Sequence, residues 1–110
     1  MTAQRKMLVA SDAGISIGSM RDVANAVSST FGSGGLILSE DDVSSEFFDL
    51  KTGLAGELFQ KFENYKLCLA VIVPNPERYG DRFNELAREH QSHNRIRIVR
   101  SREEAMAWFA

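Results

Sequence analysis

An unbroken apolar run near the middle of the chain restricts the fold more than any other feature: Leu67-Cys68-Leu69-Ala70-Val71-Ile72-Val73. A strand with one face in water alternates apolar and polar residues, whereas a strand covered on both faces is apolar throughout. Pro74-Asn75-Pro76 follows at once and ends the run, because proline cannot donate to a sheet ladder. The run therefore predicts a central strand with helices on both faces of its sheet.

Short apolar segments and helical periodicity alternate along the rest of the chain. Three more strands are predicted, at residues 6–10, 36–38 and 95–99. Apolar spacings of three and four residues predict helices at about 20–30, 53–65, 76–90 and 102–109, with a short one after Ser39. Strands separated by helices imply right-handed crossovers and a parallel sheet. The predicted fold is one α/β domain over residues 1–110, with about four mostly parallel strands and four or five helices; residues 15–17 fit either a strand or a loop.

The composition argues against several broad classes of protein. The chain is 44% hydrophobic and 25% charged, which is typical of a globular domain and not of a disordered chain. Its net charge of -2 argues against a general nucleic-acid binder, which is normally basic. No long apolar segment follows residues 1–6, so neither a signal peptide nor a membrane helix is expected. We expect a cytoplasmic protein that contacts neither nucleic acid nor membrane.

No catalytic or metal-binding set stands out in the sequence. His90 and His93 form a His-x-x-His pair beside Glu89, but a zinc site needs three or four ligands. Cys68 is the single cysteine, and no base lies near it in sequence. Gly32-Ser33-Gly34-Gly35 follows a helix and precedes a strand, which is the reverse of a phosphate-binding loop. We therefore expect no cofactor and no metal site, and the sequence favours a non-enzymatic role over an enzymatic one.

Polar residues follow the predicted strands, at the edge where ligands of parallel sheets usually bind. These residues are Ser11, Asp12, Ser39 and Asn75, with Glu40, Asp41 and Asp42 beside Ser39. The acidic group is similar to that of a phosphoacceptor receiver domain, but the aspartate after the central strand and the later lysine are missing. The acids also suit the first turn of a helix, whose dipole favours negative charge. A small-ligand or nucleotide site at these strand ends is the alternative function.

The block from Phe47 to Phe62 combines a turn, a helix start and an apolar stripe. Thr52 is predicted at or beside the N-cap of the helix, where its hydroxyl accepts a bond from a free backbone N–H. Gly53 and Gly56 permit close packing of helix and sheet, or the close approach of a partner. A phosphate on Thr52 would add about -1.5 to -2 charge at the helix start. The candidate interaction or phosphoacceptor residues are Asp49, Thr52, Gly53 and Gly56.

Parts of this block and the segment after it resemble a known family. They are Phe47-Phe48-Asp49-Leu50, Thr52-Gly53-Leu54-Ala55-Gly56-Glu57 and Gln60-Lys61-Phe62-x-Asn64-Tyr65, continued through Lys66 to Val73. From about Leu36 onward the chain resembles the bacterial family called domain of unknown function 4180, which has no established activity. It departs from the family pattern at Pro74-Asn75, where a Gly-Asp is expected, and in the next helix at Gly80-Asp81-Arg82 and Glu89-His90-Gln91.

The same block is more distantly similar to STAS domains, the sulfate-transporter and anti-sigma-factor-antagonist module. In that family an apolar residue, an aspartate, a phosphorylatable serine or threonine and Gly-Leu open a helix after a strand. Phe48-Asp49-Leu50-Lys51-Thr52-Gly53-Leu54 resembles this order with one or two extra residues. The likeness implies a STAS-like fold and a non-enzymatic regulatory or protein-interaction module that contacts a protein partner through Thr52. A homodimer packed through an edge strand or through Trp108-Phe109 is a third hypothesis.

Overall fold

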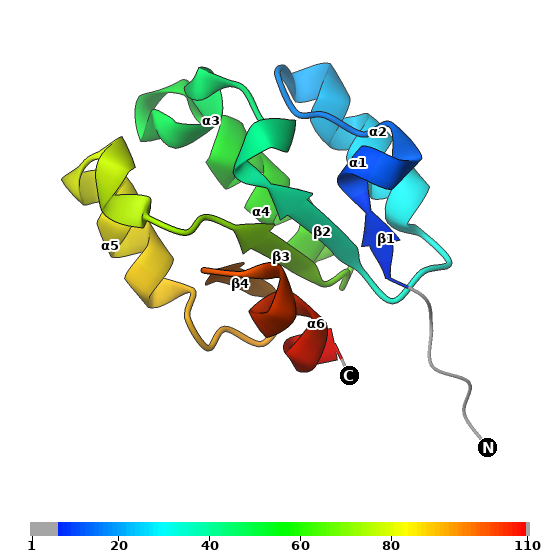
Figure 1. Cartoon of the computed structure of the whole chain (residues 1–110). Helices are drawn as coiled ribbons and strands as arrows, with labels where there is room; N and C mark the ends of the chain where they lie inside the picture. The colour runs from blue at the N-terminus through cyan, green and yellow to red at the C-terminus, as the bar shows by residue number, and fades with distance from the viewer. Residues whose placement is uncertain (1–6, 110) are drawn as a thin grey trace.

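The computed structural model describes residues 7–109, and its centre is a sheet of parallel strands (Figure 1). The strands are β1 (Leu8–Val9), β2 (Leu36–Ser39), β3 (Leu69–Ile72) and β4 (Ile96–Val99), in the order β1-β2-β3-β4. Leu69 of β3 lies opposite Leu36 on one side and Ile96 on the other, so β3 is an inner strand as its apolar run predicted. The predicted α/β fold with a parallel sheet is confirmed. Lys6, predicted in the first strand, lies outside the described residues.

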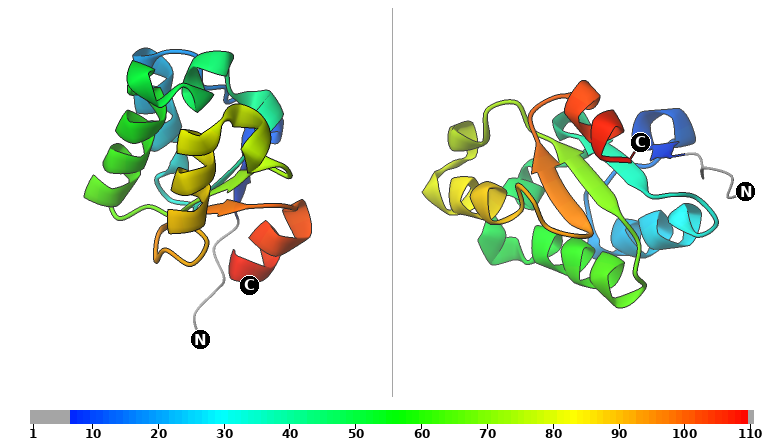
Figure 2. Two further views of the ribbon diagram at one scale, coloured as in Figure 1. Left: turned by 90° about the vertical axis from the view of Figure 1, so that its left-hand side faces the viewer. Right: turned by 90° about the horizontal axis from the view of Figure 1, so that it is seen from below.

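Within residues 7–109, six α-helices and three short 3-10 helices connect the strands. The α-helices are α1 (Ala10–Ala13), α2 (Met20–Thr30), α3 (Ser45–Phe48), α4 (Leu54–Asn64), α5 (Asp81–Glu89) and α6 (Arg102–Phe109). The 3-10 helices are η1 (Glu40–Asp42), η2 (Leu50–Thr52) and η3 (Pro76–Tyr79). The long helices α2, α4 and α5 lie on one face of the sheet, and α6 lies on the other (Figure 2, right).

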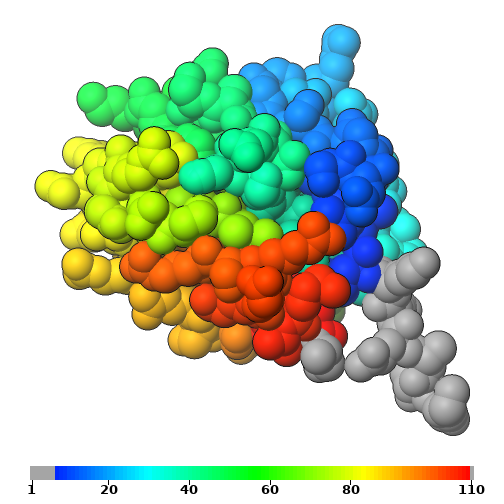
Figure 3. Space-filling view, viewed as in Figure 1, coloured from blue at the N-terminus to red at the C-terminus, as the bar shows by residue number. Residues whose placement is uncertain are grey.

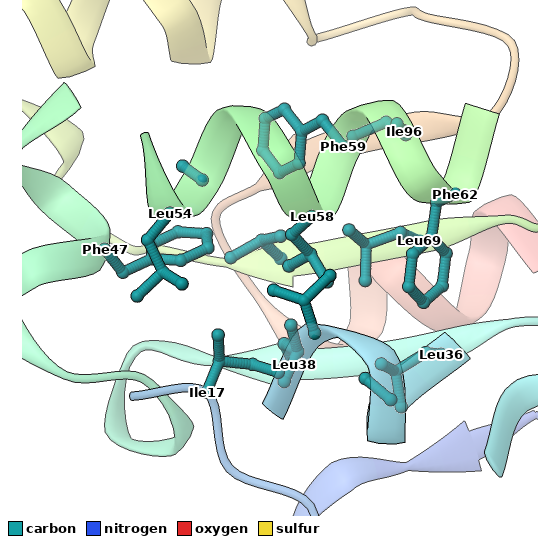
Figure 4. Packing of buried hydrophobic residues seen from close by; sticks show 14 of the residues in the cluster. Ile17, Leu36, Leu38, Phe47, Leu54, Leu58, Phe59, Phe62, Leu69 and Ile96 are labelled. Carbon is teal, nitrogen blue, oxygen red and sulfur yellow. The ribbon is translucent and has the colours of Figure 1, made fainter. Parts of the chain in front are cut away.

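The main core lies between the sheet and the layer of α2, α4 and α5. The buried residues of α4 follow the apolar stripe that the sequence predicts, and they are Leu54, Ala55, Leu58, Phe59 and Phe62. They face Leu36, Leu38, Leu69 and Ile96 of the sheet (Figure 4). Burying a leucine or phenylalanine side chain contributes about 1.5 to 3 kcal/mol. This packing therefore fixes α4, and with it the residues at its start, firmly on the sheet.

A smaller cluster covers the opposite face of the sheet. Ile37, Ala70 and Val99 pack there against Ala105 of α6. The guanidinium carbon of Arg97 lies 4.6 Å from the centre of the Trp108 ring, which is a cation–π contact between β4 and α6. Trp108 thus holds the final helix on the chain's own sheet.

The loop between α1 and α2 is tied to the segment that leads to α3. Ile17 forms an isolated parallel bridge with Val43, which settles the open question of residues 15–17 as a loop with one bridge. The Ile17 N–H donates to the Asp42 carbonyl (2.8 Å), and the Ser44 N–H donates to the Ile17 carbonyl (2.9 Å). The bridge therefore anchors the chain just before α2 to the chain just before α3.

Several local predictions are wrong. In each case the strand or helix ends, or is interrupted by a turn, before its apolar pattern ends. The first strand ends at Val9 and not at residue 10, and Ser11 and Asp12, which follow it as predicted, lie in the short helix α1. The helix predicted over 76–90 is divided at Gly80, whose φ of +98° belongs to a turn. The helix predicted at about 53–65 is present as α4, but Tyr65, predicted on its apolar face, caps its C-terminus and is 53% exposed.

Candidate functional site

The predicted site around Thr52 is a tight turn between α3 and α4. We call residues 46–53 the Thr52 corner. The Thr52 N–H donates to the Asp49 carbonyl (3.0 Å), and the Gly53 N–H donates to the Leu50 carbonyl (3.2 Å). The Asp49 side chain accepts the N–H of Lys51 (3.1 Å) and so begins η2. Asp49 and Thr52 are both exposed, so the corner lies at the surface.

The Thr52 hydroxyl connects the two helices that meet at the corner. Its Oγ1 lies 2.7 Å from the Glu46 carbonyl oxygen and 2.8 Å from that of Asp49, and it donates its proton to these acceptors. The same oxygen accepts the N–H of Leu54 (3.3 Å), the first residue of α4. Gly53 is the N-cap of α4, so Thr52 lies beside the cap, and its bond to a free backbone N–H is present as predicted.

The two glycines of the site have different roles. Gly53 has a φ of +77°, a left-handed conformation that glycine adopts without strain. Gly56 lies on the exposed side of α4, and a methyl group there would meet no atom within 4 Å. The close packing of helix and sheet predicted at Gly56 is therefore wrong: this glycine opens a bare patch of helix surface to solvent.

An apolar groove runs beside the corner, between α2 and α4. We call it the α2/α4 groove; its volume is about 280 Å³. Met20, Phe31 and Tyr65 line it and are 49%, 53% and 53% exposed, and Val23 and Val27 line its buried side. Figure 2 (right) shows α2 and α4 side by side on the outer side of the molecule.

Contacts at each end give the groove a defined shape. The Phe31 and Tyr65 rings meet edge to face, with centroids 5.5 Å apart, and close one end. At the other end, a Cβ on Gly53 would lie 3.8 Å from Cε of Met20, so the groove begins at the Thr52 corner. Glu57 and Lys61 of α4 form an ion pair (3.6 Å) along its edge. The corner and the groove are therefore one continuous surface.

Replacing Thr52 by valine should lower the free energy of unfolding by about 1 kcal/mol, because valine keeps the shape but loses the hydroxyl bonds. Thr52→Ser retains the hydroxyl and should stay within about 0.5 kcal/mol of wild type. Urea unfolding followed by circular dichroism measures both values. A valine variant with wild-type stability would mean that the hydroxyl contributes nothing to the corner.

The polar residues predicted at the strand ends do not meet in one cleft. Ser11 and Asp12 are exposed on α1. Ser39 donates through its N–H and its hydroxyl to Asp42 Oδ2 (2.8 and 3.1 Å), a helix-start arrangement that uses both groups internally. Asn75 is exposed and precedes η3 without a side-chain capping bond. Their ligand-binding role stays a prediction: the ends of β2 and β3 are neighbours, with Ser39 paired with Ile72, but Ser11, Asp12 and Asn75 do not line the cleft there.

Ser39 lines a cleft between the ends of β2 and β3, together with Glu40 and Asp41 beside it. Its volume is about 460 Å³, and Arg78 and Tyr79 form its far side. The Tyr79 hydroxyl donates to Glu40 Oε1 (2.9 Å). Partial burial is the main cause that raises the pKa of Tyr79, and this hydrogen bond raises it further. The Tyr79 ring stacks on Phe48, with centroids 3.7 Å apart. These contacts tie η3 to η1 and α3, and they account for Tyr79 structurally.

The residues that form the groove were not predicted as a site. Met20 and Tyr65 fall on the apolar stripes of their helices, and such residues are normally covered. The sequence feature that could have indicated their exposure is their position at the ends of the stripes, where a helix terminus leaves one side of the residue open.

Two further properties concern the described part of the chain. None of the helices in residues 7–109 combines the length and the apolar character needed to cross a membrane. Across the same residues, histidine, cysteine, aspartate and glutamate side chains nowhere gather in threes around a position that a metal ion could occupy.

Comparison with known proteins identifies one family. The sequence matches the family described as domain of unknown function (DUF4180) over residues 2–109. Comparisons with curated proteins and with solved structures give no match. The matched range extends the resemblance, seen from about Leu36 onward, through the first strand and α2. The chain therefore belongs to the DUF4180 family.

Proposed function

We propose that this chain is a cytoplasmic, non-enzymatic protein-interaction module whose docking surface is the α2/α4 groove with the Thr52 corner. The main support for this proposal is that exposed apolar residues are grouped in one place. Of the four large apolar side chains that are exposed in the described chain, Met20, Phe31 and Tyr65 line this one groove. Exposed apolar residues gathered in one place mark interaction sites more often than scattered ones do.

The shape and charge of the groove favour an amphipathic helix of a partner protein. A groove between two helices receives the apolar face of a third, with anchors one turn apart. Lys61 and Glu57 offer both signs of charge at its edge, so the polar flank of such a helix finds complementary groups there. Gly56 precedes Glu57 on the exposed side of α4 and carries no side chain, which lets a partner backbone approach at this position.

The regulatory part of the proposal rests on Thr52 and its likeness to the STAS phosphoacceptor. A phosphate on Oγ1 would remove the proton that Thr52 donates to the carbonyls of Glu46 and Asp49. It would also add about -1.5 to -2 charge next to those oxygens. Because Gly53 of the corner lies beside Met20 at one end of the groove, opening the corner would change the docking surface. We expect phosphorylation of Thr52 to weaken docking.

The test is affinity capture from a lysate of the native organism, with four matched baits. Met20→Lys and Tyr65→Lys should each lower recovery of the partner by about tenfold or more, because each places a charge in the apolar contact. Met106→Lys is the control: Met106 is 47% exposed and lies on α6, outside the groove. A partner kept by wild type and the control but lost by both groove variants supports the proposal. Equal recovery with all four folded baits contradicts it.

The regulatory part has its own comparison. Thr52→Glu should lose the partner, and Thr52→Ser should keep it. Circular dichroism spectra of both variants must match that of wild type. Retention of the partner by a folded Thr52→Glu variant would contradict the role of charge at this position.

A second copy of the chain is the alternative occupant of the α2/α4 groove, and its binding is distinguished from that of a partner protein by a further measurement. Pairing through the outer edge of β4 is disfavoured, because the N–H groups of Ile96, Ile98 and Arg100 already donate to His93 Nδ1 (3.2 Å), the His90 carbonyl (3.0 Å) and Glu104 Oε1 (3.4 Å). Sedimentation velocity of wild type and Tyr65→Lys should show monomers for both. A wild-type dimer that Tyr65→Lys abolishes would identify the second copy as the occupant.

A further inference from the structure

At the ends of β3 and β4 the chain leaves two neighbouring strands toward opposite faces of the sheet. After β3 it continues through η3 to α5, on the side of α2 and α4. After β4 it turns directly into α6, on the other side (Figure 2, right). In open parallel sheets, such a divergence leaves a crevice outside the carboxyl ends of the two strands, and ligands bind there.

A cleft of about 550 Å³ occupies this position. Ligand pockets commonly measure about 300 to 1,000 Å³. Its floor is apolar and comes from Val73 after β3, Ala87 of α5 and Ile98 of β4, all buried. Figure 3 shows part of the neighbouring surface, where the segment after β3 (yellow-green) lies beside the end of β4 and the start of α6 (orange to red). The sequence contained no motif for this cleft, because its lining combines η3, α5, β4 and α6, which are separate in the sequence.

Two guanidinium groups line the cleft from different elements. Arg88 belongs to α5, and Arg100 follows β4. One Arg100 Nη donates to the Pro74 carbonyl (3.0 Å), which lays this side chain across the ends of both strands. The ion pairs of the described residues are formed by Lys61, His93 and Arg95, and neither Arg88 nor Arg100 takes part in one. Both guanidiniums therefore keep donors that no carboxylate side chain in residues 7–109 uses in an ion pair.

The two carboxylates that line the cleft, those of Glu77 and Glu104, form no ion pair with Arg88 or Arg100. Glu104 Oε1 accepts the backbone N–H of Arg100 (3.4 Å), and its own N–H donates to Ser101 Oγ (3.1 Å), so Glu104 belongs to the start of α6. Glu77 lies on η3 at the side of the cleft. The amide side chains of Asn84, in α5, and of Gln91, just after it, add further polar groups to the lining.

We propose that this cleft binds a small anionic molecule, with a carboxylate or phosphate held by Arg88 and Arg100 and a compact apolar part on the floor. Guanidinium groups bind both anions through paired N–H donors, which is why the two are named as one class. The site is separate from the docking surface of the proposed function. It uses α5 and β4 rather than α2 and α4, so either can fail without the other.

The test is titration of the purified full chain with two probes, sodium phosphate and sodium succinate, against sodium chloride at equal ionic strength. Isothermal titration calorimetry gives Kd, and amide chemical shifts in NMR locate binding. We expect at least one probe to bind with Kd below about 10 mM, which is weak but measurable, and to shift amides around Val73, Asn84 and Ile98. Arg88→Gln and Arg100→Gln should each weaken it about tenfold.

The matched control is Arg82→Gln, which removes an exposed arginine from α5 outside the cleft. It should bind as wild type does. Phosphate binding alone would point to a phosphate-bearing ligand, and succinate binding alone to a carboxylate. The proposal is overturned if neither probe shifts these amides, or if Arg88→Gln weakens binding no more than Arg82→Gln. Arg88 is exposed, so its variant is expected to fold whatever the outcome for Arg100→Gln.

Discussion

Replacing Phe47 by alanine should lower the free energy of unfolding by about 3 to 5 kcal/mol. Phe47 is fully buried, and its ring contacts those of Phe48, Phe59 and Phe83, with centroids 5.5, 6.2 and 6.4 Å apart. These three belong to α3, α4 and α5, so one side chain joins three helices. Its removal leaves a cavity that the surrounding helices cannot close together. Urea unfolding should show a lower midpoint with an unchanged slope.

Two variants separate this packing effect from a general loss of aromatic character. Phe47→Leu keeps most of the volume and should cost about 1.5 kcal/mol or less. Phe31→Ala removes a ring that is 53% exposed and should change stability by about 0.5 kcal/mol or less. A loss below about 1 kcal/mol for Phe47→Ala would mean that the helices close around the gap.

The same residue links stability to the proposed docking surface. Phe47 holds α3 on the core, and α3 supplies the Glu46 carbonyl that accepts the Thr52 hydroxyl. A Phe47→Ala variant that stays folded should therefore loosen the Thr52 corner, and its partner recovery should fall even though no groove residue has changed.

The elements whose patterns are local could be predicted from the sequence. The run from Leu67 to Val73 requires no knowledge of its neighbours, since only a strand covered on both faces is apolar throughout. The stripe of α4 is equally local, because residues three and four apart necessarily share a helix face. The bond between the Thr52 hydroxyl and the Leu54 N–H followed from the residue type and its place before a helix.

Features that depend on two distant elements could not be predicted. Whether Met20 and Tyr65 are covered depends on how far α2 and α4 extend past each other, and no pattern within either helix records this distance. The cleft at Arg88 and Arg100 depends on α6 crossing to the opposite face from α5. The sequence pattern of α6 predicts that one side of the helix is apolar, but it does not indicate which face of the sheet that side covers.

Introducing alanine at Gly35 should lower the free energy of unfolding by about 2 to 4 kcal/mol, through overpacking together with an unfavourable φ. Gly35 directly precedes β2 and lies between β1 and β3. Its carbonyl accepts the N–H of Leu8 (2.9 Å), and the next N–H, from Leu36, donates to the Cys68 carbonyl (3.0 Å). A Cβ at this position would lie only 2.8 Å from that same Cys68 oxygen and 3.0 Å from Cys68 Cβ.

The clash involves backbone that is itself part of the sheet, so rotation of a side chain cannot relieve it. The φ of Gly35 is +154°, which an alanine rarely adopts. Gly56→Ala is the matched control, because the same methyl meets open space on α4 and alanine favours a helix; it should raise stability by about 0.5 kcal/mol. Opposite signs for the two variants in urea unfolding would separate a glycine required by strand packing from one that only exposes helix surface. Equal effects would mean that the start of β2 can move away from β3 without breaking the bonds on either side.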